Sequence, residues 1–318
     1  MRNQEDLLAL AGRYATDQRA PVATITKEIL HYEILHALQD SGALEHLTFQ
    51  GGTSLRLCYQ GNRYSEDLDF AGGRDFDPRV MDPFCELLKR EIADAYGLAV
   101  AISEPESGKH DEQSTVTVAR WNARIAIPNA SRSLPQRELI KIEVANVPAY
   151  DADLVPVAIN YPHLPAPFSQ MLIPVESRAE ILADKIVALS ARPYFKARDI
   201  WDIKFLLNKG IPQAEGLKFV GRKLLDYGLP VDTFRAGLTA RIEQLRTPET
   251  AESFRKEMIR FVDQTVARYL ERTEFIDKIM ESSIDLGQYV LNANLEQPAQ
   301  NVEAKKAAPR SRPRKPQA

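Results

Sequence analysis

Two aspartates, Asp67 and Asp69, have the type and spacing that metal-dependent chemistry requires. They lie in the alternating run Asp67-Leu68-Asp69-Phe70-Ala71, which predicts a half-buried strand. On a strand both carboxylates project from one face, while Leu68 and Phe70 face the core. Two adjacent negative charges repel, so the pair favours a cation between them, and such oxygen ligands suit Mg²⁺ or Mn²⁺. We therefore predict a divalent-metal site at Asp67 and Asp69.

A glycine turn precedes this pair. The segment Phe49-Gln50-Gly51-Gly52-Thr53-Ser54-Leu55 predicts a short strand, a tight turn and a helix that Thr53 caps. Glycines let the backbone approach a ligand closely, and the amides at a helix start point at it, so a triphosphate is the expected occupant. For Arg56 and Arg63, which flank the loop, phosphate contact and solvent exposure are both open. The expected substrate-binding residues here are Gly51, Gly52, Thr53, Ser54 and Arg56.

A third carboxylate, Glu143, is expected on a neighbouring strand. The run from Leu139 to Val144 alternates and places Lys141 and Glu143 on one face. Glu143 could complete the metal site or accept the proton of an attacking hydroxyl. Alternatively, Lys141 and Glu143 are the solvent-exposed side chains of an edge strand. The spacing does not choose between these interpretations.

The composition is that of an ordinary globular chain. Of 318 residues, 44% are hydrophobic and 27% charged, and the net charge is −3, so a nucleic-acid partner would need a local basic surface. Cys58 and Cys85 are predicted to be buried free thiols, and the five histidines show no ligand spacing for a transition metal. We find neither a secretory signal nor a run of apolar residues long enough to span a bilayer, and expect a cytoplasmic protein without a membrane partner.

The elements that must position these residues change character along the chain. Periodicity predicts strands at 47–50, 98–103, 114–127 and 138–144 between helices at 5–16, 24–40 and 78–96. Helices then dominate at 177–191, 197–208 and most of 213–290. We predict an α+β core over 1–170, a helical lobe over 171–296 and a basic, disordered tail over 297–318, either merely solvated or weakly attracted to RNA. The tail's cations are Lys305, Lys306, Arg310, Arg312, Arg314 and Lys315.

Four motifs in order resemble a known family. Gly52-Thr53, thirteen intervening residues and Asp67-Leu68-Asp69 resemble the signature of DNA-polymerase-β-like nucleotidyltransferases. The fuller string FQGGTSLRLCY…RYSEDLDF is similar to the AbiEii/AbiGii (MenT-like) toxins, although that family often has serine in place of Thr53. The runs 183–189 and 196–202 are similar to the family's lysine motif and paired-aspartate motif. The resemblance covers about residues 30–207.

The resemblance implies a two-lobed nucleotidyltransferase fold, with a small mixed sheet carrying the metal site and a helical lobe closing over it. It implies transfer of a nucleotide from an NTP to RNA, with tRNA 3′ ends the substrate class of relatives, and a cognate antitoxin encoded nearby. Lys185 would reach a phosphate and Asp199 would be catalytic, with Asp202 in support as a substrate-binding residue. From position alone, Lys185 is an ordinary solvated lysine, and Asp199 and Asp202 form intrahelical ion pairs with Arg198 and Lys196.

Two other functions fit the same residues. The acceptor could be a small molecule or a protein side chain, because the fold does not decide the acceptor. The chain could also be a binding module that kept the fold and lost activity. The presence of Gly52, Thr53, Asp67, Asp69 and Lys185 together argues against the latter.

Overall fold

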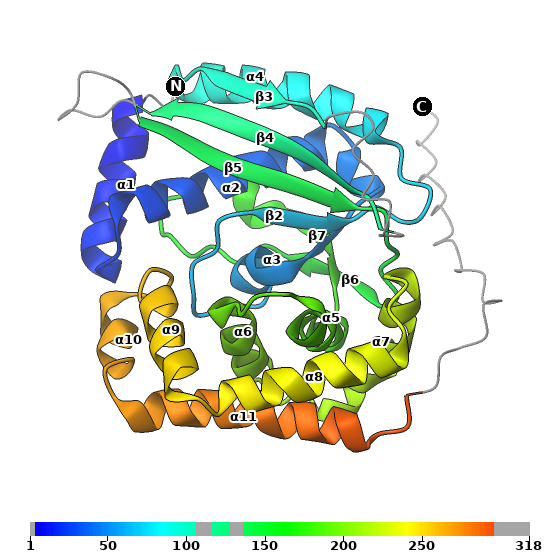
Figure 1. Cartoon of the computed structure of the whole chain (residues 1–318). Coiled ribbons are helices and arrows are strands. Elements are labelled where there is room, and N and C mark those ends of the chain that lie inside the picture. Colours follow the sequence, from blue (N-terminus) through cyan, green and yellow to red (C-terminus); the bar gives the residue numbers. More distant parts are fainter. Residues whose placement is uncertain (1–3, 106–115, 128–135, 296–318) are drawn as a thin grey trace.

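A computed structural model of the chain describes residues 4–105, 116–127 and 136–295 (Figure 1). Its strands are β1 (Thr48–Gln50), β2 (Leu68–Ala71), β3 (Val100–Ser103), β4 (Val118–Ile127), β5 (Gln136–Ala145), β6 (Ala152–Pro156) and β7 (Leu172–Glu176). Its first four helices are α1 (Gln4–Gln18), α2 (Val22–Asp40), α3 (Gly51–Cys58) and α4 (Asp82–Tyr96). The later helices are α5 (Arg178–Ala191), α6 (Ala197–Asn208), α7 (Gln213–Asp226), α8 (Val231–Leu245), α9 (Pro248–Met258), α10 (Gln264–Tyr269) and α11 (Thr273–Asn292).

The seven strands form one mixed sheet in the order β3-β4-β5-β2-β1-β7-β6. Two short antiparallel strands lie at its centre: β1, which leads into the glycine turn, and β2, which carries Asp69. The pairs β2–β5 and β1–β7 are parallel, and the other pairs are antiparallel. The α+β fold class predicted from the sequence is confirmed. The strand that carries Glu143, β5, lies between β4 and β2, so the edge-strand interpretation of Glu143 is wrong.

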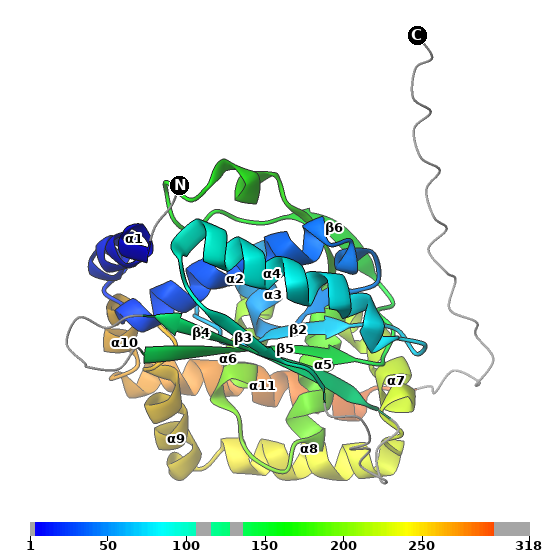
Figure 2. The ribbon, with the colours of Figure 1, turned by 90° about the horizontal axis from the view of Figure 1, so that it is seen from above.

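Different helices pack on the two faces of the sheet. Ile140, Ile142 and Val144 of β5 are fully buried, and they face the side on which α1, α2 and α4 pack (Figure 2). The alternate residues of β5 face the other side, where α5 to α11 form a second helical layer. This alternation is the reason that the polar residues of β2 and β5 face the helical layer.

Two apolar cores correspond to the two lobes. The larger one joins α1, α2 and α4 to the sheet, and the second lies among α5 to α11. Helix α3 links them, since Leu57 belongs to the first core and Leu55 to the second. The sheet extends past the predicted boundary at residue 170, because β7 pairs with both β1 and β6. The all-helical part therefore begins at Arg178.

Most predicted elements are present, with one correction at the turn. Helix α3 begins at Gly51 and its N-cap is Gln50, so Thr53 lies inside the helix rather than capping it. Both cysteines are free and buried, as predicted. None of the helices in the described ranges is long and apolar enough to cross a membrane. The basic tail predicted over 297–318 lies outside the described residues.

Candidate active site

The glycine turn and the aspartates are joined by backbone geometry. Gln50 pairs with Asp69 across β1 and β2, so the turn that follows Gln50 lies directly beside the Asp69 side chain. Gly51 has φ +78°, and a Cβ there would lie 2.8 Å from Asp69 Oδ2. Only glycine satisfies both conditions without strain. The Thr53 hydroxyl donates to the Asp67 carbonyl, which ties α3 to the start of β2.

A third carboxylate, that of Glu143, lies beside the two aspartates on β5, the strand that flanks β2 opposite β1. Glu143 pairs with Asp69 in the parallel register of β2 and β5. Burial and the neighbouring charges of Glu143 and Asp67 raise the pKa of Asp69 to about 6, although Lys185 and Lys196 oppose the shift. Arg120 Nε donates to Glu143 Oε1 at 2.6 Å and partly offsets its charge. The sheet side of the site therefore carries an excess of negative charge that a cation would relieve.

The helical side of the site carries a paired charge network. Lys185 of α5 is 8% exposed, and its Nζ lies 2.8 Å from both Asp199 Oδ1 and Asp202 Oδ2 of α6. Arg192 Nε lies 3.1 Å from Asp199 Oδ2. Although burial opposes it, the positive charges of Lys185 and Arg192 lower the pKa of Asp199 to about 2. These pairs join different elements, so the interpretation that Asp199 and Asp202 form ion pairs with Arg198 and Lys196 is wrong.

Arg63 connects this network to the glycine turn. Its guanidinium is buried and donates through Nε and Nη2 to Asp202 Oδ1 and Oδ2 at 2.6 and 2.7 Å. A Cβ on Gly52 would lie 2.2 Å from Arg63 Nη2, so the turn packs directly on this guanidinium. Arg63 is 5% exposed, so the interpretation of a solvated arginine is wrong, and phosphate contact stays a prediction because Arg63 lines the cavity. Its pairing with Asp202 fixes Gly52 relative to Lys185.

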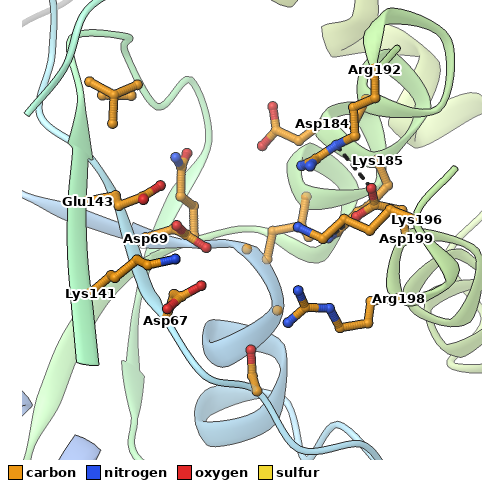
Figure 3. Close-up of a pocket in the computed structure, with 18 of the residues that line it drawn as sticks. Asp67, Asp69, Lys141, Glu143, Asp184, Lys185, Arg192, Lys196, Arg198 and Asp199 are labelled. Carbon is orange, nitrogen blue, oxygen red and sulfur yellow. Dashed lines mark hydrogen bonds and ion pairs between the residues drawn. The ribbon is translucent and has the colours of Figure 1, made fainter. Parts of the chain in front are cut away.

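Between the two sides lies a cavity of about 700 Å³. Figure 3 shows Asp67, Asp69, Lys141 and Glu143 on the sheet side of this cavity, with the residues of α5 and α6 opposite. Three cations that we did not predict for the site, Arg192, Lys196 and Arg198, lie on the helical side. Their signal in the sequence is two basic residues in the short connection between two motif-bearing helices and a third in the first turn of α6. A carboxylate cluster facing cations is the arrangement that a metal-bound triphosphate requires.

Comparison with known proteins identifies the family. The model of the nucleotidyl transferase AbiEii toxin family, of type IV toxin–antitoxin systems, matches residues 33–275. The chain belongs to this family. It is therefore a nucleotidyltransferase of the AbiEii type, and the resemblance seen in its motifs is confirmed.

Comparison with solved structures gives matches to this AbiEii-family protein. The nucleotidyltransferase toxin MenT4 from Mycobacterium tuberculosis is 19% identical with a TM-score of 0.53, over 89% of this chain and 97% of that chain. JHP933 from Helicobacter pylori is 16% identical with a TM-score of 0.46, over 86% and 93%. At 19% identity the likeness to MenT4 concerns the fold alone. Comparison with curated protein sequences gives no significant match.

Some residues predicted to bind substrate in this nucleotidyltransferase lie elsewhere. Arg56 faces away from the cavity and donates to Glu28, with Nε 3.0 Å from Oε1. Thr53 and Ser54 are buried within α3, and the Ser54 hydroxyl donates to the Gly51 carbonyl at 2.8 Å. Asp202 is enclosed by Arg63 and Lys185. In the described part of the chain, these four support the site from outside, whereas Gly51 and Gly52 line the cavity.

The donor set of the AbiEii-family site fits a hard divalent cation. Asp67, Asp69 and Glu143 offer only carboxylate oxygens, which suit Mg²⁺ or Mn²⁺. The pKa of Asp69 is raised by burial and then by the negative charges of Glu143 and Asp67, and a bound cation would oppose both effects.

A second group of metal-ligand type lies away from the cavity. His36, Asp40 and Glu91, on α2 and α4, hold ligand atoms within 4.8 Å of one another, a spacing that Asp67, Asp69 and Glu143 do not reach together. The sequence did not indicate this group, because Glu91 comes from another helix. His31, by contrast, is buried in the core, and burial lowers its pKa to about 3.

Proposed function

We propose that the protein transfers a nucleotide from an NTP to RNA, with tRNA 3′ ends as the acceptor class, and thereby blocks translation. The observation that carries this proposal is the cavity itself: three carboxylates on the sheet side face Lys185, Arg192, Lys196 and Arg198 on the helical side. The carboxylates suit a divalent cation, and the cations suit the phosphates of an NTP. An RNA acceptor would place the activity in the cytoplasm, and the family implies an antitoxin as partner.

Asp67 and Asp69 would hold Mg²⁺ or Mn²⁺, with Glu143 completing the set or receiving the proton of the acceptor hydroxyl. When bound, the ion neutralises charge on the α-phosphate and the departing pyrophosphate. The absence of side chains at Gly51 and Gly52 leaves room for Asp69 and Arg63 beside the turn, and both glycines line the cavity in which the phosphates would lie. Arg192, Lys196 and Arg198 would hold the outer phosphates, because each lines the cavity.

Lys185 and Asp199 would work as a unit. Asp199 stays ionised, since its pKa is lowered to about 2, and this makes it a poor proton acceptor. It orients Lys185, whose ammonium has a third N–H that the two aspartates do not require. Lys185 would therefore donate to a phosphate, while Asp202 and Arg63 hold it in place.

The test is incorporation of label from each α-³²P-labelled NTP into total RNA, with Mg²⁺ present. We expect label in RNA of tRNA size with the wild-type protein and none with Asp67→Asn. Asp94→Asn, an exposed aspartate of α4 outside the cavity, is the matched control and should label like the wild type. Label in a protein or small-molecule fraction instead of RNA would change the acceptor. Equal labelling by Asp67→Asn would overturn the mechanism.

A further inference from the structure

The sheet continues beyond the cavity as an exposed face. Along β4, the alternate residues Val118, Arg120, Asn122 and Arg124 point away from the buried core, and Val118 is 47% exposed. Across the strand pair, Asn122 lies opposite Lys141, and Arg124 lies opposite the exposed Leu139. We call these six residues the β4–β5 ledge.

The ledge is basic. Arg120, Arg124 and Lys141 stand on this face, and the carboxylate beside them is Glu143, already paired with Arg120. Within the described ranges, neither Arg124 nor Lys141 has an acidic partner. Exposed cations without acidic partners attract an anionic ligand.

The ledge is continuous with the active site. Val118, Arg120 and Lys141 line the cavity, and Arg124 lies about 13 Å further along the strand from Arg120. Ser103 of β3 steadies the outer end, since Asn122 Nδ2 donates to its Oγ at 3.2 Å. A ligand on the ledge would therefore lead into the carboxylate cluster.

An aromatic side chain stands at the cavity's helical rim. Tyr194, in the connection between α5 and α6, lines the cavity and is 60% exposed. Exposed aromatic rings beside cations are the usual means of binding unpaired nucleobases by stacking. An acidic peptide would use the cations but would gain little from the ring.

We propose that the β4–β5 ledge binds the phosphate backbone of a single-stranded RNA end and that Tyr194 stacks on one of its bases. This rests on the proposed function, for which it supplies the acceptor site. The ledge guides the backbone toward the cavity, so that the terminal hydroxyl meets the carboxylates. The backbone contacts are independent of sequence, and the stacking selects unpaired ends over duplex.

The first test is fluorescence anisotropy with a short, labelled single-stranded RNA and the full chain, without NTP. Arg124→Glu should raise the Kd about 10-fold and reduce the slope of log K against log salt by about 1 or more. Arg90→Glu is the matched control, because it makes the same charge change on α4, on the other side of the sheet. A Kd unchanged by Arg124→Glu, or raised equally by Arg90→Glu, would overturn the proposal.

The second test concerns the ring. Tyr194→Ala should weaken RNA binding by about 10-fold, and Tyr194→Phe should restore it, because stacking needs the ring and not the hydroxyl. Competition by polyglutamate as strong as by RNA would indicate an acidic protein partner instead and would overturn the RNA assignment.

The experiments distinguish a failure of the ledge proposal from a failure of the proposed function. If the wild type labels RNA but Arg124→Glu binds it equally well, the ledge proposal is wrong and the function stands. If Arg124→Glu loses binding but the wild type labels no RNA, the ledge stands and the acceptor of the transfer is another molecule.

Discussion

Two acidic groups face each other across the cavity, and their electrostatics are opposite. On the sheet side, Asp69 lies beside Asp67 and Glu143, and its pKa is raised to about 6. On the helical side, Asp199 lies beside Lys185 and Arg192, and its pKa is lowered to about 2. Burial raises the pKa of both carboxyls, and the negative neighbours of Asp69 add to this effect, whereas the positive neighbours of Asp199 reverse it. A cation would complete the sheet side, which we call the incomplete side, whereas the helical side is balanced by its own cations and forms a frame.

The largest expected effect tests the incomplete side. Asp69→Asn should lower nucleotide transfer by on the order of 1,000-fold, because the cation would lose a ligand. The same change should leave the metal-free protein as stable as the wild type or more so, since it removes repulsion with Glu143 and Asp67. Incorporation of label into RNA measures nucleotide transfer, and thermal unfolding in EDTA measures the stability of the metal-free protein. A variant that is both inactive and strongly destabilised would show that Asp69 is structural.

The balanced side should respond in the opposite way. Asp202→Ala leaves the buried Arg63 and Lys185 short of a partner, and should cost about 3–5 kcal/mol in the free energy of unfolding. Urea denaturation measures this, with Asp285→Ala on the exposed face of α11 as control. A loss as small as the control's would show that the network is not a frame.

The two sides should also differ in pH dependence. The folded pKa of Asp199 lies below its ordinary value, so its contribution to stability is present above about pH 4 and is lost as the pH falls toward 2. The folded pKa of Asp69 is raised, so ionisation of this carboxyl destabilises the folded state. The stability contribution of Asp69 is present below about pH 4. As the pH rises through 6, the free energy of unfolding should fall by roughly 2–3 kcal/mol. Denaturation of the metal-free protein between pH 4 and 7 measures this decline. It should vanish in Asp69→Asn, and its persistence would assign it to another group.

The smallest effect concerns the turn that touches the incomplete side. Gly51→Ala should cost about 1–2 kcal/mol in stability for its positive φ, and should also lower activity by displacing Asp69. Gly73→Ala is the matched control, because Gly73 has φ +81° but no atom of the described structure within 4 Å of the added Cβ. We expect similar stability losses and a loss of transfer only in Gly51→Ala. Equal activity of the two would mean that the close approach to Asp69 is unimportant.

Local patterns were enough to predict much of this protein. The alternation in β2 and β5 predicted that Asp69 and Glu143 leave the core, and helical spacing predicted α5 and α6 closely. Arg56 and Arg63 show the limit of such patterns. They flank the same loop and look alike in the sequence, yet Arg56 pairs with Glu28 away from the cavity and Arg63 with Asp202 beside it.

Which side chains share a strand face or a helix follows from the amino-acid sequence alone, because those periodicities are properties of the local backbone. The family follows from it too, through motifs whose order along the chain is independent of the contacts they make. The folded arrangement was needed to show that Glu143 lies on an inner strand opposite Asp69, and that Lys185 is held between Asp199 and Asp202. Strand order and ion pairing depend on residues far apart in the chain, and no local spacing encodes which of them meet.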